Sequence, residues 1–424
     1  MPPDTLPPVI LPQTLPSRPA TPGADPAAVP GADPGAPAPA LPRLAAPDPA
    51  ELTARLIRCP SVTPEEGGAL VLLEEILGRA GFFCQRVDRN GVANLFARIG
   101  PAGAARILGF NGHTDVVPTG DPASWTHPPF SGLEADGWIW GRGATDMKSG
   151  IAALVSAAIG FAPRLPADAA IVLTITGDEE GPGRDGTRAI LDWMAEAGER
   201  MDACIVAEPS NPERLGEMIK IGRRGSMTVV IEARGVQGHA AYPARARNPL
   251  HALVRLLGEL TAQPLDHGTE HFEPSGLQVT TIDCANPASN VIPERARAVV
   301  NIRFNDAHTS HTLGRMIRER AEGVAAETGV SFDLAFDVSG ESFLTRPGPF
   351  VDLVREVVRA ETGIEPVLST SGGTSDARFV KDHCPVLEFG LVGRFMHQID
   401  ERVPVAEIRD LARIYERILE RFFA

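Results

Sequence analysis

Several apolar segments of this chain end directly in acidic residues, and this pattern restricts the fold more than any other feature. Residues 169–176 run up to Glu179 and Glu180, and residues 203–207 are followed by Glu208. Such segments alternate with stretches of helical periodicity, which is typical of an α/β sheet. Open sheets of this kind place their sites at the C-terminal ends of the strands. We therefore expect these acidic residues to meet at one edge of a sheet.

The length of the chain and a change in its pattern of predicted helices and strands indicate an inserted domain. With 424 residues, the chain is too long for a single core of ordinary size. Around residue 224 the pattern changes to alternating strands with two helices, which indicates a separate α+β unit. We expect a catalytic domain made of residues 48–223 and 339–424, interrupted by an inserted domain at residues 224–338.

The first 47 residues have a different composition from the rest. Residues 1–47 are dominated by Pro, Ala and Gly, a composition that cannot bury enough apolar surface to offset its ordering entropy. A secretory signal is the competing interpretation, but Asp4 is acidic and prolines interrupt every apolar stretch. We therefore expect a disordered tail.

Charge and cysteine content exclude several classes of partner. A formal charge of -14 argues against nucleic acid and anionic membrane surfaces, which attract basic faces. No apolar run approaches the roughly 20 residues needed to cross a bilayer. The five cysteines show no CxxC spacing, which argues against a zinc knuckle and a disulfide framework. A reducing cytoplasm fits this chain best.

Two motifs carry side chains that suit a metal ion. His113 and Asp115 lie two residues apart at the end of a predicted strand, so both side chains point to the same side. A carboxylate that orients a histidine ligand is what a metal site requires. Asp146 follows a glycine-rich turn, and its two oxygens could bridge two cations. Taken singly, the first motif could be a surface loop and Asp146 a helix N-cap.

Three further motifs complete the set. Glu179 and Glu180 are adjacent and can take different roles, although a solvated acidic turn would have the same sequence. Glu208 follows another apolar run, and His397 lies near the C-terminus. Two histidines and three carboxylates suit a pair of borderline-soft divalent ions such as zinc, which a bridging aspartate would hold about 3.5–4 Å apart. Together the motifs predict a dinuclear centre that activates a water against an amide bond.

In this order the motifs resemble the dinuclear zinc peptidases and deacylases, the superfamily of succinyl-diaminopimelate desuccinylase, acetylornithine deacetylase, aminoacylase and glutamate carboxypeptidase. The resemblance covers residues 48–424 and implies a zinc-peptidase-like mixed sheet flanked by helices, with an inserted α+β dimerisation (lid) domain. It also implies two zinc ions per subunit, with cobalt or manganese as alternatives. The implied ligands are His113, Asp146 and Glu208 for one ion and His397, Asp146 and Glu180 for the other.

The resemblance assigns further roles around these ligands. It implies that Asp115 orients His113 and that Glu179 is the general base, which takes a proton from the attacking water. It also implies a cis peptide bond between Asp146 and Met147, which is rare before residues other than proline.

Motifs outside the metal site resemble the desuccinylases most closely. These are the segments at residues 223–226, 236–243, 290–293, 301–305 and 371–378. They imply a small-molecule N-succinyl amino acid substrate, N-succinyl-L,L-2,6-diaminopimelate, which is cleaved to succinate and L,L-2,6-diaminopimelate for lysine biosynthesis. The positions that match substrate contacts are Arg223, Asn290, Arg303 and Thr374. Guanidinium groups suit a substrate with several carboxylates, although Arg303 could equally be a surface cross-strand residue.

His239 implies a role for a second subunit. A lone histidine is usually a turn or core residue, but the segment around His239 matches the family's GHxAYP motif. That match implies that His239 stabilises the tetrahedral oxyanion from a partner subunit, and hence that the protein is a homodimer. His267 and His271 have the spacing of a helical ligand pair, but Gly268 indicates a loop.

The chain departs from the family pattern at one position, and two other functions are alternatives to a desuccinylase. Some relatives have an asparagine four residues before the last histidine ligand, where this chain has Gly393 followed by Arg394. A related metallo-deacylase, such as an N-acetylornithine deacetylase or another N-acyl-amino-acid hydrolase, is the nearest alternative. A binding protein that has lost turnover is the other, although every ligand and the general base are present.

Overall fold

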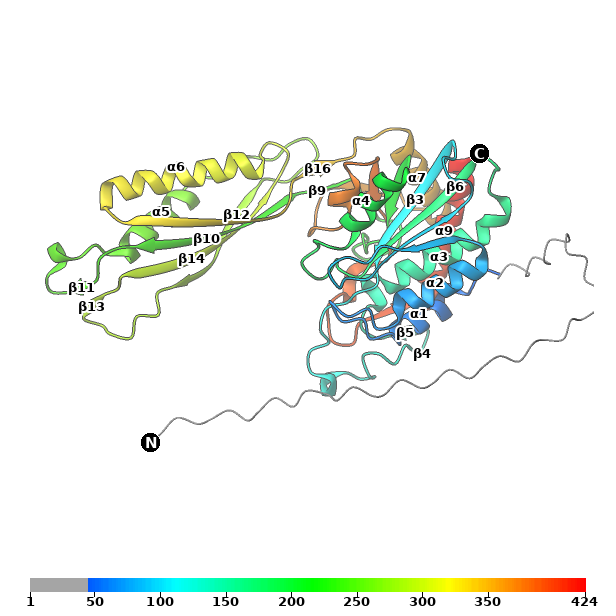
Figure 1. The fold of residues 1–424 in the computed structure, drawn as a ribbon, viewed down its shortest axis with the longest axis horizontal. Helices are drawn as coiled ribbons and strands as arrows, with labels where there is room; N and C mark the ends of the chain where they lie inside the picture. Colours follow the sequence, from blue (N-terminus) through cyan, green and yellow to red (C-terminus); the bar gives the residue numbers. More distant parts are fainter. Residues whose placement is uncertain (1–44) are drawn as a thin grey trace, which may run out of the picture. The chain divides into compact units, whose positions relative to one another are not determined.

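The computed structural model describes residues 45–424, and an eight-stranded mixed sheet lies at the centre of the larger region (Figure 1). The strand order is β1-β2-β6-β3-β7-β18-β8-β17. These strands are β1 (Phe83–Arg86), β2 (Asn94–Ile99), β3 (Arg106–His113), β6 (Ala169–Thr176), β7 (Ala203–Val206), β8 (Met218–Lys220), β17 (Val367–Ser369) and β18 (Val386–Glu388). Strand β3 is parallel to both of its neighbours, β6 and β7. The predicted tail, apart from residues 45–47, lies outside the described residues.

Both faces of the large sheet are covered, which explains the continuous apolar runs. Strand β6 is buried along its whole length. Its residues Ile171, Leu173 and Ile175 belong to the larger core, whereas Ala170 and Val172 belong to a smaller one. Because successive side chains of a strand point to opposite faces, the two cores lie on opposite faces of the sheet.

Helices supply the second layer of each core. The larger core contains residues of α1 (Pro49–Ile57), α2 (Ala69–Ala80), α3 (Ser149–Phe161), α7 (Pro349–Thr362) and α9 (Val405–Phe423). The smaller core contains residues of α4 (Thr187–Ala197) and α8 (Ala377–Val380). The mixed sheet flanked by helices confirms the fold class that the sequence predicts.

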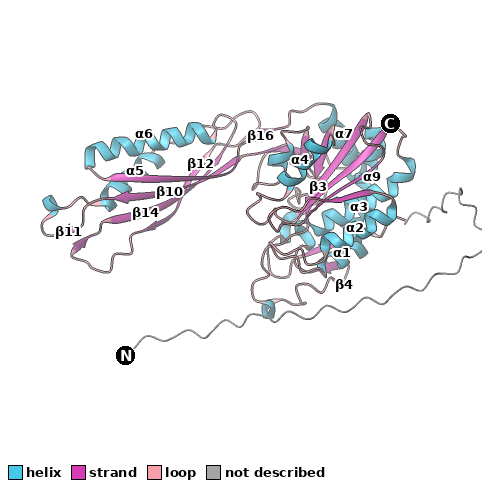
Figure 2. Ribbon diagram, in the orientation of Figure 1, coloured by secondary structure: helices cyan, strands magenta, loops and turns pink. Residues whose placement is uncertain are grey.

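A four-stranded antiparallel sheet forms the second region, with strand order β12-β14-β10-β15. Its elements are β10 (Gly225–Arg234), β12 (Gly276–Asp283), β14 (Arg295–Phe304), β15 (Ser331–Gly340), α5 (Pro249–Thr261) and α6 (Ser310–Thr328). Figure 2 shows both helices on the same side of this sheet. They share a core with the alternate, buried residues of β10, namely Met227, Val229, Ile231 and Ala233. Strand β15 was not among the predicted strands, although its apolar residues Phe332, Leu334 and Phe336 alternate along it and are half-buried.

Two short paired strands mark where the chain enters and leaves this second region. Strand β9 (Gly222–Arg223) precedes it, β16 (Phe343–Leu344) follows it, and the two pair in antiparallel fashion. By their contacts, residues 45–424 belong to one compact unit. The predicted domain boundaries at residues 224 and 338 therefore stay predictions.

The remaining elements are small. They are the three-stranded sheet of β4 (Leu133–Ala135), β5 (Trp138–Trp140) and β19 (Arg402–Pro404), the pair of β11 (Gly238–His239) and β13 (Val291–Ile292), and short helical turns at Pro122–Ser124, Ala144–Lys148, Ala162–Arg164, Pro243–Arg245 and Gly393–Phe395. None of the helices within residues 45–424 combines the length and apolar character needed to span a bilayer.

The packing of α9 on the large sheet predicts the effect of one core substitution. The Tyr415 hydroxyl is fully buried and donates a hydrogen bond to the Phe389 carbonyl at 2.5 Å. We expect Tyr415→Phe to lower the free energy of unfolding by about 1–3 kcal/mol, because this buried carbonyl loses its partner. The shift of the urea unfolding midpoint measures this loss. Val367→Ala, at a side chain that is 60% exposed, should change stability by no more than about 0.5 kcal/mol.

Candidate metal centre

The C-terminal ends of three neighbouring strands bring the acidic residues together. His113 is the last residue of β3, Glu179 and Glu180 follow β6, and Glu208 follows β7. Because these three strands are parallel and adjacent, their C-terminal ends lie at one edge of the sheet. Asp146 comes from the turn that precedes α3.

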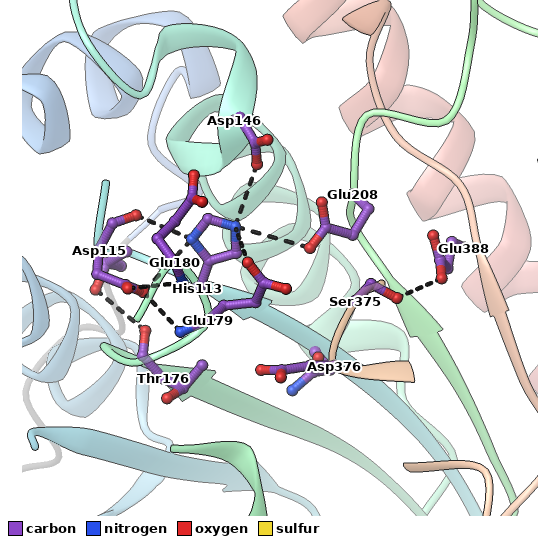
Figure 3. Close-up of polar contacts among 12 residues, drawn as sticks. His113, Asp115, Asp146, Thr176, Glu179, Glu180, Glu208, Ser375, Asp376 and Glu388 are labelled. Carbon is purple, nitrogen blue, oxygen red and sulfur yellow. Dashed lines mark hydrogen bonds and ion pairs between the residues drawn. The ribbon is translucent and has the colours of Figure 1, made fainter. Parts of the chain in front are cut away.

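Three carboxylates surround one nitrogen of His113, which is itself fully buried (Figure 3). The distances from His113 Nε2 are 3.2 Å to Asp146 Oδ1, 3.7 Å to Glu208 Oε1 and 3.9 Å to Glu179 Oε2. Ionised carboxylates only accept hydrogen bonds and repel one another, so a cluster of this kind requires cations. Two groups of side chains could each hold a metal ion, namely His113 with Asp146 and Glu180, and His113 with Glu179 and Glu208.

Asp146 faces both histidines with different oxygens. Its Oδ1 lies 3.2 Å from His113 Nε2, and its Oδ2 lies 3.4 Å from His397 Nε2. His397 Nε2 is also 2.9 Å from Glu180 Oε1. Burial opposes ionisation of Asp146, but its hydrogen bonds to the two histidines overcome this and lower its pKa. Hydrogen bonds to Asp146 and Glu180 raise the pKa of His397 to about 10. The arrangement is that of a carboxylate placed between two cation sites.

The peptide bond between Asp146 and Met147 is cis, as the resemblance implies.

Asp115 contacts His113 chiefly through its backbone, since His113 Nδ1 lies 2.9 Å from the Asp115 carbonyl and 3.5 Å from its carboxylate. The Asp115 carboxylate instead accepts hydrogen bonds from the backbone N–H groups of Glu179 and Glu180, at 3.2 and 3.0 Å. Asp115 therefore contacts both the histidine and the acidic turn.

Burial changes the acidity of Glu179 more than any neighbouring charge does. It raises the pKa of Glu179 to about 8, and the nearby carboxylates of Asp376 and Asp146 act in the same direction while His113 opposes them. Burial likewise raises the pKa of Asp115 to about 6. A carboxylate with a pKa near neutrality can accept and return a proton at physiological pH.

Two residues that the sequence did not predict hold the ligand segments in place. Arg142 and Glu401 form a buried ion pair, with 2.6 Å between Arg142 Nη1 and Glu401 Oε2. Glu401 also accepts hydrogen bonds from the backbone N–H groups of Thr145 and Asp146, at 2.8 and 3.1 Å. Arg142 donates to the His397 carbonyl at 3.4 Å. Both residues lie close to a ligand in the sequence, but no local pattern pairs residues that are 259 positions apart.

A cavity of about 370 Å³ opens beside the carboxylate cluster. Its lining residues are Asp146, Glu179, Glu180, Glu208, Pro209, Lys220, Arg223, Arg303, Gly372, Gly373, Thr374, Met396 and His397. Arg223, Arg303 and Thr374 were expected to contact substrate, whereas Lys220 was not. Burial, assisted by the charge of Arg223, lowers the pKa of Lys220 to about 8. The cavity therefore has an acidic floor and a basic wall.

The guanidinium group of Arg223 is already engaged within the chain. It pairs with both carboxylate oxygens of Glu388, and its Nη1 donates to the Gly373 carbonyl at 2.9 Å. Glu388 also accepts a hydrogen bond from Ser375, at 2.5 Å. These contacts fix the orientation of Arg223 at the wall of the cavity.

His239 and Asn290 lie together but apart from the cavity lining. His239 is the last residue of β11 and Asn290 directly precedes β13, and the Ala240 N–H donates to the Asn290 carbonyl at 2.9 Å. Both residues are exposed. Within residues 45–424 of the single chain, no residue of this pair of strands lines the cavity.

The other residues considered in the sequence analysis, Arg394, His267 and His271, lie outside the cavity lining. Arg394 pairs with Glu213 and does not line the cavity, so it does not replace the asparagine of the relatives. His267 and His271 lie in a loop, as expected.

Comparison with known proteins identifies close relatives. The chain is 77% identical, over 379 residues, to the succinyl-diaminopimelate desuccinylase of Paracoccus denitrificans, an alignment that covers 89% of this chain and 99% of the relative. Among solved structures, an aminopeptidase from Bacillus cereus matches with a TM-score of 0.72 and 18% identity over 88% of this chain and 98% of that one. The YXEP protein of Bacillus subtilis, described as a dinuclear metal binding peptidase, matches with a TM-score of 0.67 and 16% identity over 88% and 96%.

The likeness to these two structures concerns the fold alone, because their sequence identities are low. The family model of peptidase family M20/M25/M40 matches residues 109–421, which contain the carboxylate cluster and the whole four-stranded sheet, while β1 and β2 of the large sheet precede the match. This chain therefore belongs to peptidase family M20/M25/M40.

Proposed function

We propose that this protein is a metal-dependent amide hydrolase that cleaves N-succinyl-L,L-2,6-diaminopimelate to succinate and L,L-2,6-diaminopimelate, a step of lysine biosynthesis. The observation that carries the proposal is the acidic cluster of possible metal ligands beside a cavity with a basic wall. The name of the relative that is 77% identical supports the choice of substrate.

The side chains at the site fit two divalent ions. Asp146 turns one oxygen to His113 and the other to His397. Within residues 45–424, the carboxylates of this cluster pair only with the two histidines and with no Lys or Arg within 4 Å. We assign zinc to both sites, with cobalt as an alternative at one, held by His113, Asp146 and Glu208 and by His397, Asp146 and Glu180. Bound ions of this kind supply Lewis acidity, which polarises a carbonyl and lowers the pKa of a water.

Glu179 acts as the general base and then as the general acid. It accepts a proton from the attacking water, whose oxygen forms a bond to the amide carbonyl carbon. As the carbon–nitrogen bond breaks, Glu179 returns that proton to the departing nitrogen. Its position 3.9 Å from His113 Nε2 places it inside the ligand cluster, and its raised pKa suits both proton transfers.

The basic wall favours an acyl group that carries its own carboxylate. Lys220 and Arg303 lie on this wall with Arg223, and the Thr374 hydroxyl adds a donor. A succinyl group ends in a carboxylate that these residues can bind, whereas an acetyl group has none. We therefore favour the desuccinylase over the alternative of an N-acetylornithine deacetylase.

We also propose a cytoplasmic homodimer. All five cysteines are free thiols, which is consistent with a reducing compartment. His239, in β11, and Asn290, directly before β13, are exposed on the surface, where they could reach the substrate of a second subunit.

The paired substrate assay tests the function directly. The purified, zinc-loaded protein should hydrolyse N-succinyl-L,L-diaminopimelate with a kcat/KM at least about 100-fold above that for N-acetylornithine, since an unpaired buried cation in the cavity costs about 3 kcal/mol. Equal hydrolysis of both substrates would refute the substrate assignment.

Glu179→Gln should keep two metals per chain and lose about 100-fold or more in kcat. Glu196→Gln, at an exposed position of α4, is the matched control.

The pKa shifts in the cluster predict that the metal-free protein loses stability between about pH 6.5 and 8. The raised pKa of His397 gives stability that is complete below its ordinary value of 6.5 and decreases as the pH rises towards 10. Glu179 has a pKa that rises from 4.5 to about 8, so below pH 8 it is largely protonated in the folded state and ionised in the unfolded state. This difference lowers the stability of the fold further as the pH rises to 8. The Tm of chelator-treated protein should therefore fall from pH 6.5 to 8.

Zinc should raise the Tm more at pH 8 than at pH 6.5, because metal binding competes with protons. His397→Gln should reduce the fall of Tm with pH in the metal-free protein, whereas the same substitution at the exposed His311 should leave that fall unchanged. A metal-free Tm that rises over this interval would contradict the expected pKa values.

The dimer is tested by mixing two inactive chains. His239→Ala and Glu179→Ala subunits, unfolded and refolded together, should recover about a quarter of the wild-type activity, because half of the dimers are mixed and each mixed dimer has one complete site. Each variant refolded alone should stay inactive. Sedimentation that shows an active monomer would exclude the action of His239 from a partner subunit.

A further inference from the structure

A second cavity adjoins the metal centre on the side of Glu179. Its volume is about 510 Å³, and it shares Glu179 and Thr374 with the cavity described above. It is lined by Glu179, Gly181, Pro182, Gly183, Arg184, Arg188, Asp337, Val338, Ser339, Thr374, Arg378 and Phe379. The walls come from the turn after β6, the first residues of α4, the region of α8 and the end of β15. The proposed reaction uses only Glu179 and Thr374 of these residues.

Three arginines line this cavity, namely Arg184, Arg188 and Arg378. Among the described residues, no Asp or Glu oxygen lies within 4 Å of Arg184, Arg188 or Arg378, although most arginines of this acidic chain form such pairs. The Nε of Arg378 is buried and has no hydrogen-bond partner. Neighbouring guanidinium groups repel one another, so their collection around a cavity favours an anion between them.

Two of these arginines, Arg188 and Arg378, are held by packing on an aromatic ring. The Cζ atoms of Arg188 and Arg378 lie 4.8 and 4.7 Å from the centroid of the Phe379 ring. A Cβ atom at Gly183 would come within 2.4 Å of Arg378 Nη2, so the absence of a side chain at that turn leaves room for the guanidinium. Stacking restricts the orientation of a guanidinium while leaving its N–H groups free to donate.

Asp337 supplies the opposite charge in the same cavity. It lies near the end of β15, and no Lys, Arg or His nitrogen within residues 45–424 is 4 Å or closer to its carboxylate. An exposed carboxylate without a partner, together with a group of unpaired arginines, matches a ligand that carries a carboxylate and an ammonium group. An amino acid head has both groups on one carbon.

We propose that this cavity binds the amino acid end of the departing amine, with Arg184, Arg188 and Arg378 on its carboxylate and Asp337 on its ammonium group. The inference rests on the proposed function, in which Glu179 protonates the nitrogen that leaves. The amine therefore departs on the side of Glu179, into the cavity that Glu179 helps to line. The succinyl carboxylate is bound on the other side, by the basic wall at Lys220 and Arg303.

Two substrate analogues, each lacking one distal charged group, test the carboxylate contact and the ammonium contact separately. N2-succinyl-L-lysine lacks the distal carboxylate but keeps the ammonium group, and N-succinyl-L-2-aminopimelate lacks the distal ammonium group but keeps the carboxylate. Arg188→Gln should lower kcat/KM for the full substrate by about 30-fold and for N2-succinyl-L-lysine by less than about threefold, because the lost interaction is a charge-assisted hydrogen bond. Asp337→Asn should lower kcat/KM for the full substrate while sparing N-succinyl-L-2-aminopimelate.

Arg318→Gln is the matched control, since Arg318 also stacks on a phenylalanine, at 4.4 Å from the ring of Phe336, and lies outside this cavity. It should leave all three kcat/KM values unchanged. Activity on the shortened substrates shows that each variant is folded. If Arg188→Gln and Asp337→Asn reduce all substrates equally, or none, the assignment of the cavity is wrong while the proposed function stands. If the wild-type protein hydrolyses none of the succinyl substrates, the proposed function fails and this inference fails with it.

Discussion

The buried ion pair between Arg142 and Glu401 supports the geometry of the whole site. Glu401 accepts the backbone N–H groups of Thr145 and Asp146, and Arg142 donates to the carbonyl of His397. One pair therefore ties the turn before α3 to the loop that carries the last histidine. A buried pair of this kind adds little net stability, because desolvation offsets its Coulomb energy, but removing one partner leaves an uncompensated charge. Its contribution here is to set the distance between Asp146 and His397.

Burying several carboxylates together is the cost of this arrangement. Burial raises the pKa values of Glu179, Asp115 and Glu208, which means that the folded protein resists ionising them. Divalent cations reverse this preference, since they bind the ionised form and lower the local potential. The same residues that could hold metal therefore make the stability of the fold depend on pH.

In the proposed function, the two cavities bind different parts of the substrate on either side of Glu179. One has an acidic floor and a basic wall with Lys220 and Arg303, and the other is lined by three arginines and by Asp337. Since Glu179 and Thr374 belong to both, the scissile bond of a bound substrate lies between a cavity for the acyl group and a cavity for the amine. Charge in both cavities, rather than apolar area, then determines which acylated amine is hydrolysed.

Local periodicity and strand order allowed much of this protein to be predicted from its sequence. The apolar run at residues 169–176 is strand β6 as predicted, and the residues expected to bind metal do gather, because the C-terminal ends of parallel strands share one edge. Tertiary structure alone decided which distant partners those residues meet. Arg142 and Glu401 are 259 positions apart, and Arg188 meets Phe379 only where α4 packs against α8. Periodicity reports which face of an element is buried, whereas the pairing of charges depends on how separate elements pack, and no local pattern records that.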